Sequence, residues 1–169
     1  NRLTEVETTV DKDVHRSTEA KYYYYDYGPL ARIELGEYQV QGLDYAYTIN
    51  GWIKGLNSNT LEVGRDMGKD SRIGYTQQDP NIHRNFAKDV FGYTVNYFNR
   101  DYEAVGGSSF EANYLGTPLG AYNQDLFNGN IRHVVTAIEG MDIQGYGYRY
   151  DQLQRLKQMQ VFRSTNLKI

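Results

Sequence analysis

Hydrophobic and polar residues alternate with a period of two along residues 21–35, 38–56 and 131–162 of this chain. These stretches are rich in tyrosine, valine and isoleucine. Such alternation is the main sequence signal of strands that bury one face, and aromatic and β-branched residues favour strands. Residues 89–102 contain two further extended pieces around Asn99-Arg100-Asp101. The pattern predicts an all-β fold.

Turn dipeptides separate the alternating stretches and predict that the strands are joined as serial antiparallel hairpins. An Asn-Gly pair supplies positive φ at both central positions of a type I′ turn, whose twist matches the flanking strands. It is therefore the strongest short-range hairpin signal. The dipeptides are Gly28-Pro29, Gly36-Glu37, Asn50-Gly51 and Asn128-Gly129.

Two polar segments, residues 57–88 and 106–124, interrupt the pattern, and we interpret them as insertions or long loops in a single array spanning residues 1–169. A loop as long as the first is uncommon in a compact domain. Its second half carries Ile82, Phe86 and then Val90 at helical spacing. This spacing suits a short amphipathic helix over residues 81–90.

Residues 151–161 are ambiguous, because Leu153, Leu156 and Met159 are spaced by three among good helix formers. An internal repeat indicates a turn and a strand instead. Residues 41–47 (QGLDYAY) align with residues 144–150 (QGYGYRY) at an offset of 103. The same offset places Asn50-Gly51 over Leu153-Gln154, so the later copy should also turn there and continue as a strand.

Composition adds one unusual feature, which is 17 Tyr against 6 Phe and 1 Trp. Aromatic rings that carry a hydroxyl suit a sheet that is solvated on one side.

A length of 169 residues fits one domain. The net charge is −3 and no Lys/Arg cluster is present, so we do not expect nucleic acid as a partner. No run approaches the roughly 20 apolar residues of a membrane helix, and the chain begins with Asn, as a fragment would.

A Tyr-Asp pair followed by a short turn, glycine, arginine or asparagine and an aliphatic residue recurs along the chain. In this it resembles the bacterial rearrangement-hotspot (RHS) or YD-repeat proteins, and with its insertion it resembles the large secreted members of that family. The matching residues are Tyr25-Asp26 with Gly28 and Arg32-Ile33, Tyr150-Asp151 with Arg155-Leu156, Asn128-Gly129-Asn130-Ile131, Asn1-Arg2-Leu3, and residues 42–47, 52–55 and 89–93.

The resemblance implies a sheet of consecutive hairpins that spirals into a β-shell, which encapsulates or displays a C-terminal toxin or effector. The implied partners are neighbouring RHS repeats of the same parent chain and an encapsulated toxin polypeptide, and the implied location is secreted or on the bacterial cell surface. The family's self-cleaving, aspartate-rich core has no counterpart in this sequence. We therefore carry over no catalytic residue, and we expect no enzyme activity and no cofactor.

The repeat assigns structural roles to its tyrosine, glycine and turn residues. Tyrosines on one strand face can stack across neighbouring strands, and we expect Tyr23, Tyr25 and Tyr27 to share such a face. An aspartate that starts a turn can accept a hydrogen bond from the backbone two residues on. The residues expected to have these roles are Tyr23, Tyr25, Asp26, Gly28, Arg32, Tyr45, Tyr47, Asn50, Gly51, Asn128, Gly129, Tyr148, Tyr150, Asp151 and Arg155.

Other residue types could carry chemistry, but each has a simpler interpretation. His15, His83 and His133 are far apart in sequence and Cys is absent, so we do not expect a metal site. Carboxylate pairs could form a glycosidase or calcium site, but we interpret Asp66 with Asp70, and Glu34 with Glu37, as solvated charges.

The alternative to a repeat shell is a cell-surface adhesin or carbohydrate-binding module. Aromatic residues also line glycan-binding surfaces, and Trp52 follows a predicted hairpin turn. If Trp52, Tyr45 and Tyr47 lay together on an open face, that arrangement would support this alternative and a glycan partner.

Overall fold

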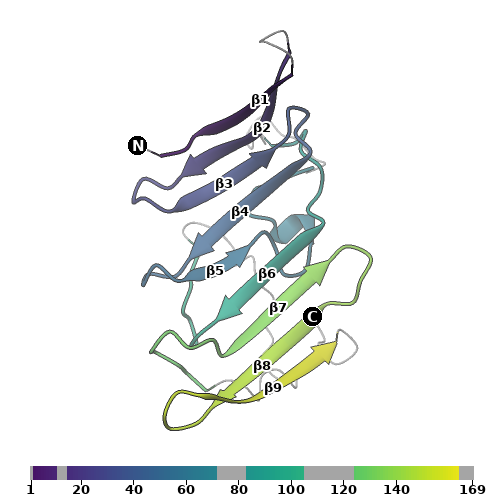
Figure 1. Ribbon diagram of the computed structural model, residues 1–169. Coiled ribbons are helices and arrows are strands. Elements are labelled where there is room, and N and C mark those ends of the chain that lie inside the picture. Colours follow the sequence, from purple (N-terminus) through teal and green to yellow (C-terminus); the bar gives the residue numbers. More distant parts are fainter. Residues whose placement is uncertain (1, 11–14, 72–82, 105–123, 164–169) are drawn as a thin grey trace.

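The computed structural model describes residues 2–10, 15–71, 83–104 and 124–163. They form one open nine-stranded sheet in which every neighbouring pair is antiparallel and the spatial order follows the sequence (Figure 1). The all-β fold of serial hairpins is confirmed. The strands are β1 (Glu5–Val10), β2 (His15–Tyr24), β3 (Leu30–Leu35), β4 (Gln41–Tyr47), β5 (Ile53–Leu56), β6 (Phe91–Asn96), β7 (His133–Ile138), β8 (Gln144–Tyr150) and β9 (Leu156–Arg163).

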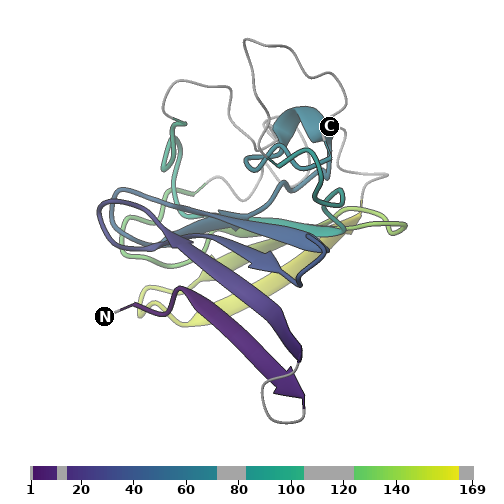
Figure 2. The ribbon, with the colours of Figure 1, turned by 90° about the horizontal axis from the view of Figure 1, so that it is seen from above.

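The two faces of the sheet differ in composition and in cover. Small and polar residues, including Gly42, Asp44 and Ala46 of β4, are buried on one face. The described part of the insertion between β5 and β6 lies over this face (Figure 2). Its backbone comes very close, since a Cβ added at Gly92 would lie 2.1 Å from the carbonyl oxygen of Ser58. The opposite face carries half-exposed tyrosines such as Tyr45.

The long insertion between β5 and β6 differs from the sequence prediction in its helical content. No helix is present in residues 83–90, where the backbone N–H of Phe86 donates to His83 in an isolated turn, so the helix prediction is wrong there. Residues 81 and 82 lie outside the described part. The one helical element in the described part of this insertion is a single 3₁₀ turn, η1 (Val63–Arg65). The local spacing does not produce a helix because Phe86 packs under the Arg32 guanidinium instead.

The second excursion, between β6 and β7, also corrects a prediction. The first extended piece of residues 89–102 is β6, but residues 97–104 contain no strand. The chain turns at Arg100, which has a φ of 58°, and β6 pairs with β7 instead. The surface loop predicted over residues 106–124 lies outside the described residues except for Gln124. In the described part of the chain, no helix is long and apolar enough to cross a membrane.

The repeat detected in the sequence is a structural repeat. Strands β4 and β8 have the same limits at the offset of 103, and so do the first residues of β5 and β9. The pairs Tyr47↔Ile53 and Tyr150↔Leu156 follow a register shift at the same place in each hairpin. The prediction of a turn and a strand over residues 151–161, against local helix propensity, is confirmed.

The turn type in these hairpins differs from the predicted type I′. At Asn50-Gly51 only Gly51 has positive φ, at 78°. The Gly51 N–H donates to Thr48 O, and the Thr48 N–H donates to Trp52 O. This is the bonding of a three-residue hairpin loop that ends in a left-handed residue. The second copy repeats it from Asp151, with Gln154 at a φ of 63°.

A third hairpin, β2–β3, has the same bonding but shifts the sequence alignment by one residue. The Tyr25 N–H donates to Pro29 O and the Gly28 N–H donates to Tyr25 O, so Tyr25 starts the loop as Thr48 and Asp151 do. Tyr24, rather than Tyr25, is thus the counterpart of the last strand tyrosine in the other two copies.

Replacing Gly51 by alanine isolates the cost of this left-handed position, because no atom lies within 4 Å of the added Cβ. We expect the free energy of unfolding to fall by about 1 kcal/mol, measured by urea denaturation followed by circular dichroism. Gly64→Ala is the matched control, since its Cβ also meets open space and its φ is not left-handed. The control should be neutral or slightly stabilising. Equal effects of the two substitutions would contradict the assignment.

Candidate functional site

The repeat tyrosines of β4 and β8 lie on the uncovered face and near the turns. Tyr45 is paired with Leu56, and Tyr148 is paired with Met159. The Tyr150 hydroxyl donates to the backbone oxygen of Ile131 at 2.9 Å. These rings therefore contact neighbouring strands while their hydroxyls find backbone acceptors or water, as expected for rings that are half-buried.

The tyrosines of the first copy are arranged differently from the sequence prediction. β2 ends at Tyr24, so Tyr23, Tyr25 and Tyr27 do not share one strand face. Tyr25 and Tyr27 stack in the loop with ring centroids 5.1 Å apart. The Tyr25 hydroxyl donates to Tyr45 O at 2.7 Å, and burial raises the pKa of Tyr25 to about 12. Tyr23 is exposed and donates to Glu34.

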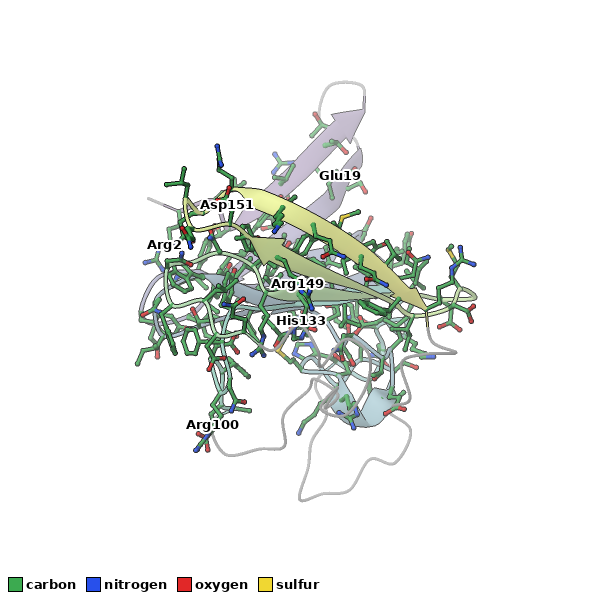
Figure 3. The ribbon with its side chains drawn as sticks, turned by 90° about the horizontal axis from the view of Figure 1, so that it is seen from below. Arg2, Glu19, Arg100, His133, Arg149 and Asp151 are labelled. Carbon is green, nitrogen blue, oxygen red and sulfur yellow. The ribbon has the colours of Figure 1, made fainter. Side chains whose placement is uncertain are left out.

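Asp151 occupies the turn-start position in the β8–β9 hairpin, where Figure 3 labels it. Its Oδ1 accepts the N–H of Leu153 at 2.8 Å, as predicted for a residue two positions on, and also that of Arg155. The Arg155 guanidinium donates to Oδ2 at 2.8 Å. Hydrogen bonds from the backbone and side chain of Arg155, and from the backbone N–H of Leu153, lower the pKa of Asp151.

The other predicted turn residues are glycines with positive φ, exposed polar residues, and Asn128, which forms a hydrogen bond within its turn. Gly28, Gly51 and Gly129 all have positive φ and allow the chain to reverse. Asp26 and Asn50 are exposed in their turns. Asn128 accepts the N–H of Asn130, and the neighbouring Gly129 lies against the Trp52 ring.

Arg32 is the centre of a buried charged cluster that joins β3, β4 and the insertion. Its Nη1 contacts Asp44 Oδ2 at 2.5 Å, and its Nη2 contacts Asp70 Oδ1 at 2.8 Å. Its Nε contacts Glu34 at 3.2 Å, and the guanidinium lies 4.7 Å from the centre of the Phe86 ring. Burial lowers the pKa of Arg32, but Asp44 and Asp70 outweigh that effect and the net shift is upward.

More carboxyl groups surround Arg32 than one guanidinium can neutralise. Burial raises the pKa of both Asp44 and Asp70 to about 6, against the opposing effect of Arg32. Burial, with the charges of Asp66, Asp70 and Asp44, raises the pKa of Asp89 to about 8. Asp89 Oδ1 accepts from Gln41, whereas Asp89 Oδ2 and Asp70 Oδ2 are buried without a hydrogen-bond partner among the described residues. At neutral pH this cluster therefore holds at least one proton on a carboxyl group.

The cluster corrects the interpretation of the carboxylates as solvated charges. Asp70 is 1 % exposed, and the Glu34 side chain is 16 % exposed and bonded to Arg32. Glu37 is exposed, as predicted. The buried carboxylates were missed because the insertion that covers them has no regular sequence pattern. The abundance of glycine near Asp66 and Asp70 was the available signal, since a Cβ at Gly68 would lie 2.2 Å from Asp44 Oδ2.

Lys54 is the centre of a second buried cluster, at the junction of β5 and β6. Its side chain is fully buried, and Nζ lies 2.6 Å from Asn96 Oδ1 and 2.7 Å from Asp101 Oδ1. Asp101 Oδ2 accepts the backbone N–H of Tyr97 at 2.8 Å. His133, labelled in Figure 3, pairs with Asn96 across β6 and β7. Burial, followed by the charges of Arg132 and Lys54, lowers its pKa to about 3, so its imidazole is neutral.

The histidines and carboxylates do not assemble a metal centre in the described part of the chain, where no three His, Asp or Glu side chains are grouped to hold an ion. His83 lies 3.5 Å from Glu34, and the side chain of His15 lies outside the described residues. The geometry instead offers buried proton-sharing carboxyls around Arg32 and an amine beside a carboxamide at Lys54. No protein-family model and no curated protein matches this chain.

Because Asp89 keeps a proton to higher pH when folded than when unfolded, the free energy of unfolding should fall as pH rises from about 4 to about 8. Asp44 and Asp70 add to the fall up to about pH 6. Asp89→Asn cannot ionise and should reduce the slope between pH 6 and 8 by up to ~1.4 kcal/mol per pH unit, measured by urea denaturation. The exposed Glu37→Gln should keep the wild-type slope. An unchanged slope in Asp89→Asn would contradict the buried proton.

Proposed function

We propose that this chain is a non-catalytic structural segment of an RHS-type YD-repeat protein, part of a β-shell that encapsulates or displays a C-terminal toxin or effector, secreted or on the bacterial cell surface. The observation that carries the proposal is the repeated hairpin, in which β4 and β8 have equal limits and the register shift and turn bonding recur at an offset of 103 residues. Repeated units that pair only with their neighbours build extended walls rather than closed cores.

The uncovered face supports a role as a wall. Its tyrosines are half-exposed, and Leu156, Met159 and Val161 of β9 are 56 %, 54 % and 46 % exposed. A sheet face of this kind is normally covered by another layer or lines an interior. Among the described strands, β9 stands at the end of the sheet, next to β8 alone. Both features fit a segment that neighbouring repeats extend and whose inner surface faces a polypeptide.

The alternative of an adhesin or glycan-binding module has weaker support. The Trp52 ring packs against Tyr97, with centroids 5.0 Å apart, and it also lies against Gly129. Its surface is therefore used for internal packing and does not form an open platform with Tyr45 and Tyr47.

The isolated chain should associate as its concentration rises, through the exposed apolar side chains of β9. Met159→Lys combined with Val161→Lys places charges on that side and should shift the chain towards monomer in sedimentation velocity. Gln158→Lys adds a charge to the same strand on its other side and should leave association largely intact. A wild-type chain that stays monomeric at all concentrations and melts cooperatively would contradict the proposed role as part of a β-shell.

The reading frame of the parent gene provides a test of encapsulation that does not depend on self-association. A self-cleaving core followed by an unrelated toxic domain on the C-terminal side of Ile169 is the expected arrangement. A sorting domain or a stop codon soon after Ile169 would instead favour a surface protein.

A further inference from the structure

We propose that Lys54 and Asn96 form an intramolecular isopeptide bond, with Asp101 as the proton-transfer group. The bond would join β5 to β6 across the base of the insertion. The proposal rests on the contact of an amine, a carboxamide and a carboxylate in one buried cluster, and it goes beyond the structural role proposed for the repeat.

The amine and the carboxamide are already in contact. Lys54 Nζ lies 2.6 Å from Asn96 Oδ1, and the carboxamide carbon, Cγ, is only one carbonyl bond of about 1.2 Å beyond that oxygen. The side chains are held from separate elements, Lys54 on β5 and Asn96 at the end of β6. Groups held in contact in this way react as if at very high concentration. A slow amide exchange can therefore proceed without an external catalyst.

Asp101 is placed to transfer the proton that the reaction requires. Its Oδ1 lies 2.7 Å from Lys54 Nζ, and its Oδ2 is fixed by the Tyr97 N–H. Lys54 is fully buried and Asp101 is 6 % exposed. In the proposed reaction the Lys54 ammonium first passes a proton to the Asp101 carboxylate across their 2.7 Å contact, which frees the Nζ lone pair and leaves a carboxylic acid.

The chemistry balances with groups already present. The Nζ lone pair of the neutral amine attacks Asn96 Cγ and forms a tetrahedral intermediate. Asp101 donates its proton to Nδ2, the Cγ–Nδ2 bond breaks, and ammonia leaves. The remaining proton on Nζ is taken up by Asp101 or by the departing ammonia. The product is a Lys54–Asn96 secondary amide, and no oxidant, reductant or second substrate is consumed.

The repeat supplies an internal comparison. Lys157 is the counterpart of Lys54 at the offset of 103, but it is exposed on β9. Lys54 is enclosed with Asn96 and Asp101 in a buried cluster, whereas Lys157 is exposed to solvent. The same lysine position is therefore reactive in only one copy.

Intact-mass spectrometry of the purified 169-residue chain, kept at neutral pH, tests the bond directly. The wild-type mass should be lower than the sequence mass by one ammonia. A digest should contain one branched peptide that joins Lys54 to Asn96. Lys54→Arg, Asn96→Ala and Asp101→Ala should each retain the full mass. A wild-type chain that keeps its full sequence mass would overturn the proposal, whether or not the variants fold.

Two controls separate this bond from other losses. Asn-Gly sequences can lose ammonia by cyclising on the backbone. Asn50→Ala combined with Asn128→Ala removes both such pairs and should still show the loss if Lys54 is the nucleophile. Lys157→Arg should also leave it unchanged. Loss of one water instead of ammonia would place the bond at Asp101 and overturn the assignment to Asn96. Loss of ammonia without the branched peptide would overturn it as well.

Discussion

The fold depends on covering a sheet face that is mostly not hydrophobic. Glycines, small residues and charged groups line it, so hydrogen bonds and ion pairs must fix the insertion between β5 and β6 in place. Arg32 connects that face to Asp70 of the insertion. Removing one partner of a buried ion pair typically costs 3–5 kcal/mol, whereas replacing the whole set by apolar residues can be neutral. Such contacts therefore specify where the insertion lies more than they add to stability.

Close backbone approach is the second requirement of this arrangement. The Arg32 guanidinium lies between Gly42 of β4 and Gly68 of the insertion, and a Cβ at either glycine would lie about 2.2 to 2.3 Å from its nitrogens. Asn57 completes the junction, because its side chain accepts the Asp44 N–H and donates to Phe91 O. Backbone N–H and C=O groups that lack a partner in the strand ladder thus form hydrogen bonds with side chains of the insertion.

The sequence predicted what depends on local pattern. Alternation located the strands, and the repeat correctly favoured a turn and strand over helix for residues 151–161, because strand pairing overrides weak local propensity. The Tyr25 copy was misaligned by one residue, since the hydrogen bonding of the loop, rather than the Tyr-Asp pair, defines the register. Asp70 and Glu34 were misjudged because their burial depends on contacts with residues distant in sequence.

The two copies of the hairpin show why the burial of a charged residue cannot be predicted from the local sequence. Asp44 and Lys54 correspond to Gly147 and Lys157 at the offset of 103, in hairpins that share their register shift and the first residues of their second strands. Lys54 is fully buried, whereas Lys157 is exposed. The same backbone pairing therefore accommodates either a buried or an exposed charge. The segments packed against each copy decide which it is: the insertion beside Asp44, and Asn96 and Asp101 beside Lys54. A repeat wall can acquire a buried site by insertion without altering its strand pairing.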